Sequence, residues 1–237
     1  MSLVIPDPRW ENPAMLIPGR KPVGPVVINR ALAVTHGLTD FILMNHSPEE
    51  FIDLVGNPRG PVVVGTTTRP ENGWLLDQTN ADASISGLSM AAATISNSQY
   101  TVAVVITPGS DGWLWARYAG GDQKQLFFTE TGFRSRQDTT GGTNILNFGD
   151  HSARCVIVTV DTDSGFHRCY QDGHLAAETS ITGTIKTTDF WFYIGNNETS
   201  SGVLDAIYQS LIAWDRALTV AEACEISRNP YSFLIPA

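Results

Sequence analysis

Short apolar segments with a β-type composition recur from about residue 60 onward, and they limit the possible fold more than any other feature of this sequence. Gly, Asn, Asp or Pro separates neighbouring segments, a spacing typical of antiparallel sandwiches and barrels. The helical stretches that a βαβ fold places between its strands are absent from the pattern. The sequence therefore predicts an all-β fold. We expect strands at Val62–Thr67, Gly73–Asp77, Tyr100–Thr107, Trp113–Tyr118, Leu126–Thr129, Gly132–Arg136, Asn144–Phe148, Ala153–Asp161, Phe166–Gln171, Phe190–Gly195 and Leu204–Trp214.

Two of these segments differ in the burial that they predict. Tyr100–Ile106 is apolar at nearly every position, as expected for a strand that is covered on both faces. Trp113–Tyr118 instead alternates large apolar residues with smaller or charged ones, as expected for a strand with one covered face.

Helical signals are few. Thr219 and Glu222 have the spacing of a capping box, in which the hydroxyl and the carboxylate each accept a hydrogen bond from a free amide at a helix N-terminus. This spacing predicts a short C-terminal helix that runs to about Arg228 and ends before Pro230. A weaker capping signal indicates a possible short helix at Pro48–Val55.

The N-terminal region is rich in proline, with six of the thirteen prolines in the first 25 residues. Proline lacks an amide donor and fixes φ, so this region cannot form a central strand. We expect an extended arm over residues 1–30, followed by one sandwich domain over residues 31–237. The apolar side chains of the arm need a burial site, either on their own domain or on a neighbouring subunit. These candidate assembly contacts are Trp10, Met15, Leu16 and Ile17.

Charge and cysteine content narrow the range of partners. The chain has a formal net charge of −9 and its 15 Lys and Arg residues are scattered, which argues against nucleic acid as a partner. No signal peptide and no membrane-spanning apolar stretch are visible, so we expect no membrane partner and synthesis in a cytoplasm. Three cysteines without a secretory signal indicate reduced thiols. Cys155 and Cys169 lie on the two strands of a predicted hairpin, offset from each other by its register.

Three motifs in the C-terminal part follow one another in the order of a known family. Cys155–Asp161 and Gly165–Gly173 form a hairpin pattern whose second strand ends in aromatic–x–Asp–Gly. Phe190–Asn196 ends in Ile–Gly–Asn, and Leu204–Glu222 combines a final strand with an aromatic–x–Arg–x–Leu–Thr turn and the capping box. Together they resemble the laminin-G-like branch of the concanavalin A-like lectin/glucanase superfamily. The resemblance implies an antiparallel two-sheet jelly-roll sandwich with a short C-terminal helix.

A narrower resemblance concerns the two ends of the sandwich. Lys21–Val26 and Arg228–Phe233 are similar to segments that frame laminin-G-like proteins of tailed phages and prophages. This implies a non-catalytic virion protein, either a head decoration or a tail or baseplate module, made in the host cytoplasm. Its arm would dock on other virion proteins, and it would form a homo-oligomer. The alternative is a lectin-like carbohydrate-binding module that recognises cell-surface glycans.

No catalytic pattern is visible in the sequence. Glycoside hydrolysis needs two facing carboxylates, and the Glu–x–Asp–x–(x)–Glu signature of the glucanase branch is absent. The five histidines are dispersed, and none lies in a Gly–x–Ser–x–Gly or His–Glu–x–x–His motif. On an apolar strand, His167 is expected to be an ordinary surface or core histidine. We therefore expect no catalytic residue and no enzyme activity.

The sequence contains no clear metal-binding or sugar-binding motif. Asp161–Gly165 imitates the start of a calcium loop, but its glycine comes one position early, which favours a tight hairpin turn. A calcium ion at the sandwich rim would need Asp205 or the loop Asn196–Glu198, and we expect no metal and no cofactor. Trp74, Trp113 and Trp115 are of a type that binds sugars, yet we expect them in the core, and no sugar-binding residue is identified.

Overall fold

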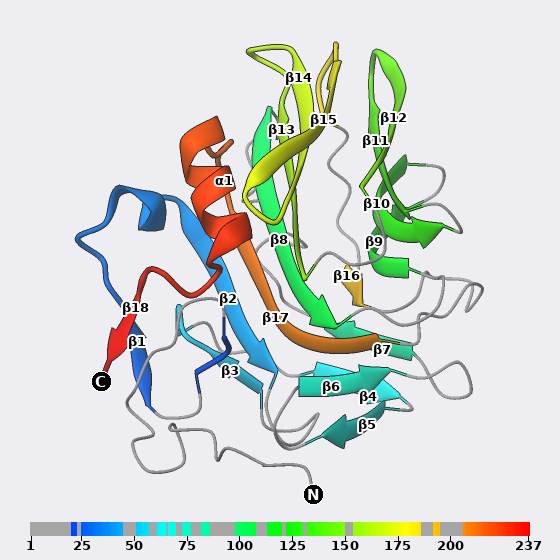
Figure 1. Ribbon diagram of the computed structural model, residues 1–237. Coiled ribbons are helices and arrows are strands. Elements are labelled where there is room, and N and C mark those ends of the chain that lie inside the picture. Colours follow the sequence, from blue (N-terminus) through cyan, green and yellow to red (C-terminus); the bar gives the residue numbers. More distant parts are fainter. Residues whose placement is uncertain are drawn as a thin grey trace, which may run out of the picture.

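The strands of the computed structural model pair into two large antiparallel sheets and one two-stranded ribbon (Figure 1). The structure describes residues 20–22, 25–44, 51–56, 61–64, 66–69, 73–76, 82–85, 98–107, 113–119, 122–129, 132–149, 154–185, 192–194 and 206–237. Within these residues the predicted all-β fold with one short C-terminal helix is confirmed. No helix in this described part is long and apolar enough to cross a membrane.

One sheet has seven described strands. In spatial order they are β12 (Gly142–Phe148), β11 (Gly132–Thr139), β10 (Asp122–Thr129), β9 (Trp113–Ala119), β16 (Phe192–Ile194), β7 (Asp82–Ile85) and β4 (Pro61–Val64). The hairpin β11–β12 forms one edge of this sheet, and its register pairs Phe133 with Phe148 and Thr139 with Gly142.

The other sheet has nine described strands. Along its main path they are β15 (His174–Ser180), β14 (Phe166–Gln171), β13 (Cys155–Asp161), β8 (Gln99–Thr107), β17 (Ala206–Trp214), β2 (Leu38–Met44) and β3 (Phe51–Asp53). β6 (Gly73–Leu76) pairs with β17, and β5 (Thr66–Arg69) pairs with β6.

The main core lies between the two sheets. Alternate residues of β8 enter it, and the intervening residues of the same strand face the opposite side of the nine-stranded sheet. Both sets are buried, so the predicted burial of Tyr100–Ile106 on both faces is confirmed. From the seven-stranded sheet this core receives Leu114, Phe133, Leu146 and Phe148.

A second core covers the outer face of the nine-stranded sheet. The helix α1 (Val220–Arg228) packs over β13 and β14 (Figure 1). Aromatic residues after the helix pack against β2. Phe41 stacks with Tyr231 at 6.4 Å between ring centroids and contacts Phe233 at 5.2 Å. The ribbon of β1 (Val26–Ile28) and β18 (Leu234–Pro236) closes the edge of this core.

The register of the β13–β14 hairpin agrees with the prediction from sequence. Val158 pairs with Cys169, and the carbonyl of Cys155 accepts a hydrogen bond from the amide of Asp172. The two cysteine side chains lie on opposite faces of the sheet, Cys155 in the outer core and Cys169 between the sheets. This placement explains physically why the two thiols cannot meet.

The helix predicted at Pro48–Val55 is wrong. Its described part begins with the strand β3, which pairs with β2 over three residues. The Asp53 carboxylate accepts hydrogen bonds from the amides of Phe41 at 3.4 Å and Val55 at 2.9 Å, so a polar side chain closes the strand end. Pairing with an existing strand outweighs a weak local capping signal.

Several described strands were missed by the sequence pattern, and β15 shows why. Its residues from His174 to Ser180 include few β-branched or aromatic types and are half-exposed along an edge. The turn before it fixes the strand instead, because Asp172 and Gly173 adopt positive φ values of 45° and 93°. Such a pair forms the tight two-residue hairpin turn that sends the chain back along β14.

The carboxylate of Asp172 contacts the start of the neighbouring strand. It accepts hydrogen bonds from the amides of Arg154 at 3.3 Å and Cys155 at 3.4 Å. The side chain therefore joins the hairpin turn to that strand start.

Candidate functional site

The hairpin β11–β12 presents a polar face on the side away from the core. Its inward residues, such as Ser135 and Leu146, are buried, whereas the alternate residues are half-buried or exposed except for Asp138, which is buried. We name this surface the β11–β12 outer face. It consists of Arg134, Arg136, Asp138, Thr143, Ile145 and Asn147.

Arg136 and Asp138 form the centre of this face. Nε and Nη2 of Arg136 donate to the two carboxylate oxygens of Asp138, at 3.1 and 3.2 Å. The Thr143 hydroxyl also donates to Asp138, at 2.8 Å from across the hairpin. The Asp138 side chain is 5% exposed and that of Arg136 is 30% exposed. A buried carboxylate therefore fixes the plane of a more accessible guanidinium.

The flanking residues add a second arginine and an apolar side chain. Nε of Arg134 donates to Oδ1 of Asn147 at 2.8 Å, and these two residues pair directly in the ladder. Ile145 pairs with Arg136 and is 49% exposed. Oriented donors beside an exposed aliphatic side chain are the combination that binds polar ligands with a hydrocarbon framework.

The turn of the hairpin is held by the loop that follows β15. The Thr139 hydroxyl donates to the carbonyl of Thr182 at 2.6 Å, and the amide of Thr184 donates to the Thr140 hydroxyl at 2.9 Å. Gly142 has a φ of 128°, a conformation that disfavours other residues. These contacts place the outer face on a fixed strand pair.

Buried polar contacts hold β11 against the other sheet from behind. Ser135 Oγ lies 2.9 Å from Nε2 of His167, and the Tyr100 hydroxyl donates to Gln137 at 2.6 Å. The amide group of Gln137 in turn donates to the backbone carbonyl of Asp138 at 2.5 Å. Burial lowers the pKa of His167 to about 4, so the imidazole is neutral at ordinary pH. His167 is thus a core histidine, one of the two placements expected from its sequence context.

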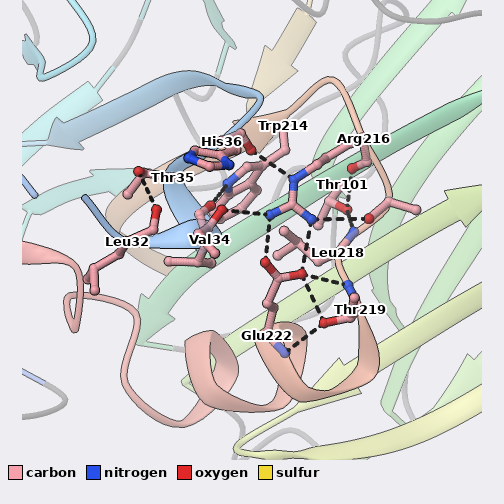
Figure 2. Close-up of polar contacts among 12 residues, drawn as sticks. Leu32, Val34, Thr35, His36, Thr101, Trp214, Arg216, Leu218, Thr219 and Glu222 are labelled. Carbon is pink, nitrogen blue, oxygen red and sulfur yellow. Dashed lines mark hydrogen bonds and ion pairs between the residues drawn. The ribbon is translucent and has the colours of Figure 1, made fainter. Parts of the chain in front are cut away.

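A second polar cluster lies where β17 leads into α1 (Figure 2). Nη1 and Nη2 of Arg216 donate to the Glu222 carboxylate at 2.9 and 2.7 Å. Nε of the same guanidinium donates to the carbonyl of His36 at 2.8 Å, and Nη2 also donates to that of Ala33 at 3.2 Å. We name this cluster the β17–α1 corner.

The predicted capping box forms part of this corner and is confirmed. The Glu222 carboxylate accepts from the amide of Thr219 at 2.9 Å, and the amide of Glu222 donates to the Thr219 hydroxyl at 3.3 Å. The hydrogen bonds from Arg216, followed by those from Thr219, lower the pKa of Glu222 to about 2. Trp214 donates from its indole to the carbonyl of Val34 at 2.7 Å, so the corner joins the end of β17 to the segment before β2.

The polar groups of the β17–α1 corner are directed at one another and at backbone carbonyls, as Figure 2 shows. The Arg216 guanidinium has acceptors at all three nitrogens, with Nη1 also near the carbonyl of Ala217 at 3.4 Å. Saturated donors of this kind stabilise a fold and have little capacity for a ligand.

The calcium-like sequence forms the tight hairpin turn that was predicted. The Asp161 carboxylate accepts from the amides of Asp163 at 3.0 Å and Ser164 at 2.9 Å. Among the residues that the structure describes, no group of His, Cys, Asp and Glu is arranged to hold a metal ion. Asp205 and the loop Asn196–Glu198 lie outside the described residues.

The other candidates from sequence belong to the N-terminal arm and to the strands β6 and β9. The arm residues lie outside the described residues; they are Trp10, Met15, Leu16 and Ile17. Trp74 belongs to β6, and Trp113 and Trp115 belong to β9, strands that the structure describes by their backbone pairing. The β11–β12 outer face was not identified from sequence, although Arg134, Arg136 and Asp138 alternate with buried residues at the period of a half-exposed strand.

The protein is thus a two-sheet β-sandwich, and the hairpin β11–β12 at the edge of one sheet carries an ordered polar face. Residues 82–224 match a laminin G family described as the concanavalin A-like lectin/glucanases superfamily. This match covers more than half of the chain, and the chain therefore belongs to this family, as the sequence motifs implied. No curated protein sequence shows a significant match.

Solved structures with the same fold include toxin binding domains and a sialidase. The binding domain of paraclostridial mosquitocidal protein 1 aligns with a TM-score of 0.61 at 15% identity, over 84% of this chain and 53% of that one. A Trypanosoma rangeli sialidase, in complex with a difluoro-KDN, aligns at 0.60 and 16% identity over 84% and 33%. The binding domain of botulinum neurotoxin DC, in complex with SialylT, aligns at 0.59 and 11% over 80% and 50%.

These likenesses concern the fold, since the identities are low. The chain spans about half the length of the two toxin binding domains and one third of the sialidase chain.

Proposed function

We propose that the chain is a non-catalytic carbohydrate-binding module and that it contacts glycans through the β11–β12 outer face. The observation that supports this most directly is the ordered set of side chains on that face. Arg136 is held by the buried Asp138, Arg134 is held by Asn147, and Ile145 is exposed beside them. Sugars bind through fixed hydrogen-bond donors next to aliphatic or aromatic surface.

Structures with the same fold add support for a binding role. The family is described by both lectins and glucanases, and two of the structures with the same fold are named as binding domains, one of them in complex with SialylT. Asp138 on the outer face accepts from Arg136 and Thr143, so its oxygens are already engaged. Glycoside hydrolysis uses two carboxylates about 5–9 Å apart, and Asp138 has no carboxylate opposite it among the described residues of the hairpin.

A glycan array followed by calorimetry on the best sugar tests this proposal. We expect saturable binding by the intact chain and a loss of at least tenfold on substitution of Asn147→Ala together with Arg134→Gln. Arg154→Gln is the matched control, because Arg154 is an exposed arginine that precedes β13 in the other sheet. Absence of binding to any glycan, or an equal effect of the control, would contradict the proposal.

The virion role stays a second proposal, and one structural observation favours a docking surface near the arm. Directly after the proline-rich region, β1 pairs with β18, and this pairing sets Val27 opposite Ile235. These two side chains are 44% and 42% exposed, which leaves an apolar pair on the outside of the ribbon. A docked virion subunit would cover such a pair together with the arm.

Deletion of residues 2–24 tests the virion proposal. We expect a folded sandwich by circular dichroism, because prolines exclude this segment from the sheets, and loss of co-sedimentation with virions. The full-length chain is the control for both measurements. Normal co-sedimentation of the truncated chain would show that the arm has no docking role.

A further inference from the structure

We infer that the β11–β12 outer face recognises a carboxylate-bearing sugar, such as a sialic acid or a uronic acid, with Arg136 as the residue that binds the carboxylate. This inference rests on the proposed function and adds the chemical class of the ligand to it. Three features support it: one nitrogen of the Arg136 guanidinium has no bound acceptor among the described residues, Arg134 lies on the same face of the strand, and the described side chains of this face carry a net positive charge.

The guanidinium of Arg136 is fixed but not saturated. Nε and Nη2 donate to Asp138, and Nη1 has no hydrogen-bond partner among the described residues. An arginine held by a carboxylate on one edge of its planar fork keeps its orientation before a ligand arrives. The entropy of ordering a long side chain is then already lost, which favours binding of an anion at the remaining nitrogen.

Arg134 extends the cationic surface along the same strand. It lies two residues before Arg136 on the same face, so the two Cα atoms are about 7 Å apart. Its Nε is bound by Asn147, which orients this guanidinium too. Two guanidinium groups on one face at this separation can both donate to a single ligand that carries a carboxylate.

The described side chains of the outer face carry a positive excess in an acidic chain. Arg134 and Arg136 against Asp138 give two positive charges and one negative charge, a local sum of +1, whereas the whole chain has −9. Ile145, the cross-strand neighbour of Arg136, adds aliphatic surface for the carbon atoms of the ring. A neutral sugar would use the donors but would gain nothing from the charge, which is the reason for preferring an acidic one.

Matched pairs of charged and neutral sugars provide the test. We would measure affinity for 3′-sialyllactose against lactose, and for glucuronate against glucose, by titration calorimetry with the full chain. We expect at least a tenfold preference for the charged member of at least one pair, and the two pairs distinguish a sialic acid from a uronic acid. The preference should weaken as NaCl is raised from 0.15 to 0.5 M, because salt screens an exposed charge pair.

Variants separate the role of the arginine fork from that of charge alone. Arg136→Gln should remove the preference, and Arg136→Lys should lose at least fivefold because a lysine cannot keep the planar fork. Arg154→Gln should bind like the unmodified chain, and unchanged melting temperatures confirm that each variant is folded. Should Arg136→Gln unfold, Arg134→Gln is expected to weaken the charged sugar selectively.

The outcomes are distinguishable. Equal binding of charged and neutral sugars, unaffected by Arg136→Gln, overturns this inference and leaves the proposed function in place. Full retention of affinity in Arg136→Lys overturns the role of the fork. Absence of binding to every sugar overturns the proposed function and this inference with it.

Discussion

Two arginine–carboxylate pairs in this protein have the same chemistry but differ in how many acceptors surround the guanidinium. At the β17–α1 corner, Arg216 binds Glu222 and the carbonyls of His36 and Ala33, so every nitrogen of its guanidinium has an acceptor. On the β11–β12 outer face, Arg136 binds Asp138 through two nitrogens only.

The difference between the pairs separates a structural arginine from a candidate binding residue. A guanidinium whose acceptors come from distant parts of its own chain stabilises the fold, and its loss leaves those acceptors without partners. A guanidinium that is oriented by one carboxylate and remains accessible can exchange water for a ligand. Residue type and charge alone do not distinguish the two cases.

Replacement of Arg216 by Ala should have the largest effect on stability. It removes hydrogen bonds to Glu222 and to the carbonyls of His36 and Ala33, and we expect a loss of about 3 kcal/mol in the free energy of unfolding. Urea denaturation followed by tryptophan fluorescence measures this change. The comparison between the two pairs would fail if Arg136→Ala cost as much.

Acid should weaken the β17–α1 corner selectively. The pKa of Glu222 falls on folding from 4.5 to about 2, so its contribution is complete above pH 4.5 and is lost as the pH falls through about 2. Because the side chain is partly exposed to solvent, we expect about 1 kcal/mol rather than the full linkage value.

The measurement is the difference in unfolding free energy between the unmodified chain and Glu222→Gln at several pH values. This difference should be constant above pH 4.5 and shrink toward pH 2. Both proteins keep His167, whose buried neutral form destabilises the fold in acid between pH 6.5 and about 4, so its contribution cancels. A difference that does not change with pH would contradict the assigned role of Glu222.

Removal of the helix cap should have a smaller effect of about 1 kcal/mol. Thr219→Ala deletes the hydroxyl that accepts from the amide of Glu222, while the ion pair with Arg216 remains. Thermal or urea unfolding measures the loss, and Thr219→Ser, which keeps the hydroxyl, serves as the control. An unchanged midpoint in Thr219→Ala would show that the ion pair alone fixes the helix start.

The smallest effect on stability is expected on the outer face. Arg136→Gln should change the free energy of unfolding by less than about 1 kcal/mol, because the glutamine amide can still donate to the buried Asp138 and the Thr143 hydroxyl keeps its hydrogen bond to that carboxylate. The same variant should lower affinity for a charged sugar at least tenfold, so stability and binding change independently. A large loss of stability would place Arg136 with Arg216 as a structural residue.

Local patterns in the sequence determined most of the fold. The turn residues between apolar segments predicted an antiparallel all-β chain, and the register of the β13–β14 hairpin followed from the position of its turn. The capping box at Thr219 predicted the start of α1, and Pro230 predicted its end. These features depend on residues that are close along the chain, so sequence spacing is sufficient to find them.

Local patterns also gave one wrong element and missed others. The signal for a helix at Pro48–Val55 was overridden by pairing of β3 with β2. The edge strand β15 has a composition that does not favour strands and is fixed by the turn at Asp172 and Gly173. In both cases the energy of pairing with another strand exceeded the local preference.

The candidate site depended on tertiary structure. The sequence motif at the end of β17 contains Arg216, but its acceptors at Ala33 and His36 lie about 180 positions earlier and are brought near by the pairing of β17 with β2. Within the described part of the chain, Arg136 has no such distant acceptor. It lies on the face of β11 that points away from the core, because the other face of this strand packs on the opposite sheet. The sequence placed Arg136 in a predicted strand and Arg216 in the turn that follows the final strand of the motif. Only the packing of the sheets determined that one is saturated by its own chain and the other is open to a ligand, because hydrogen-bond partners far apart in sequence meet only after the sheets have formed.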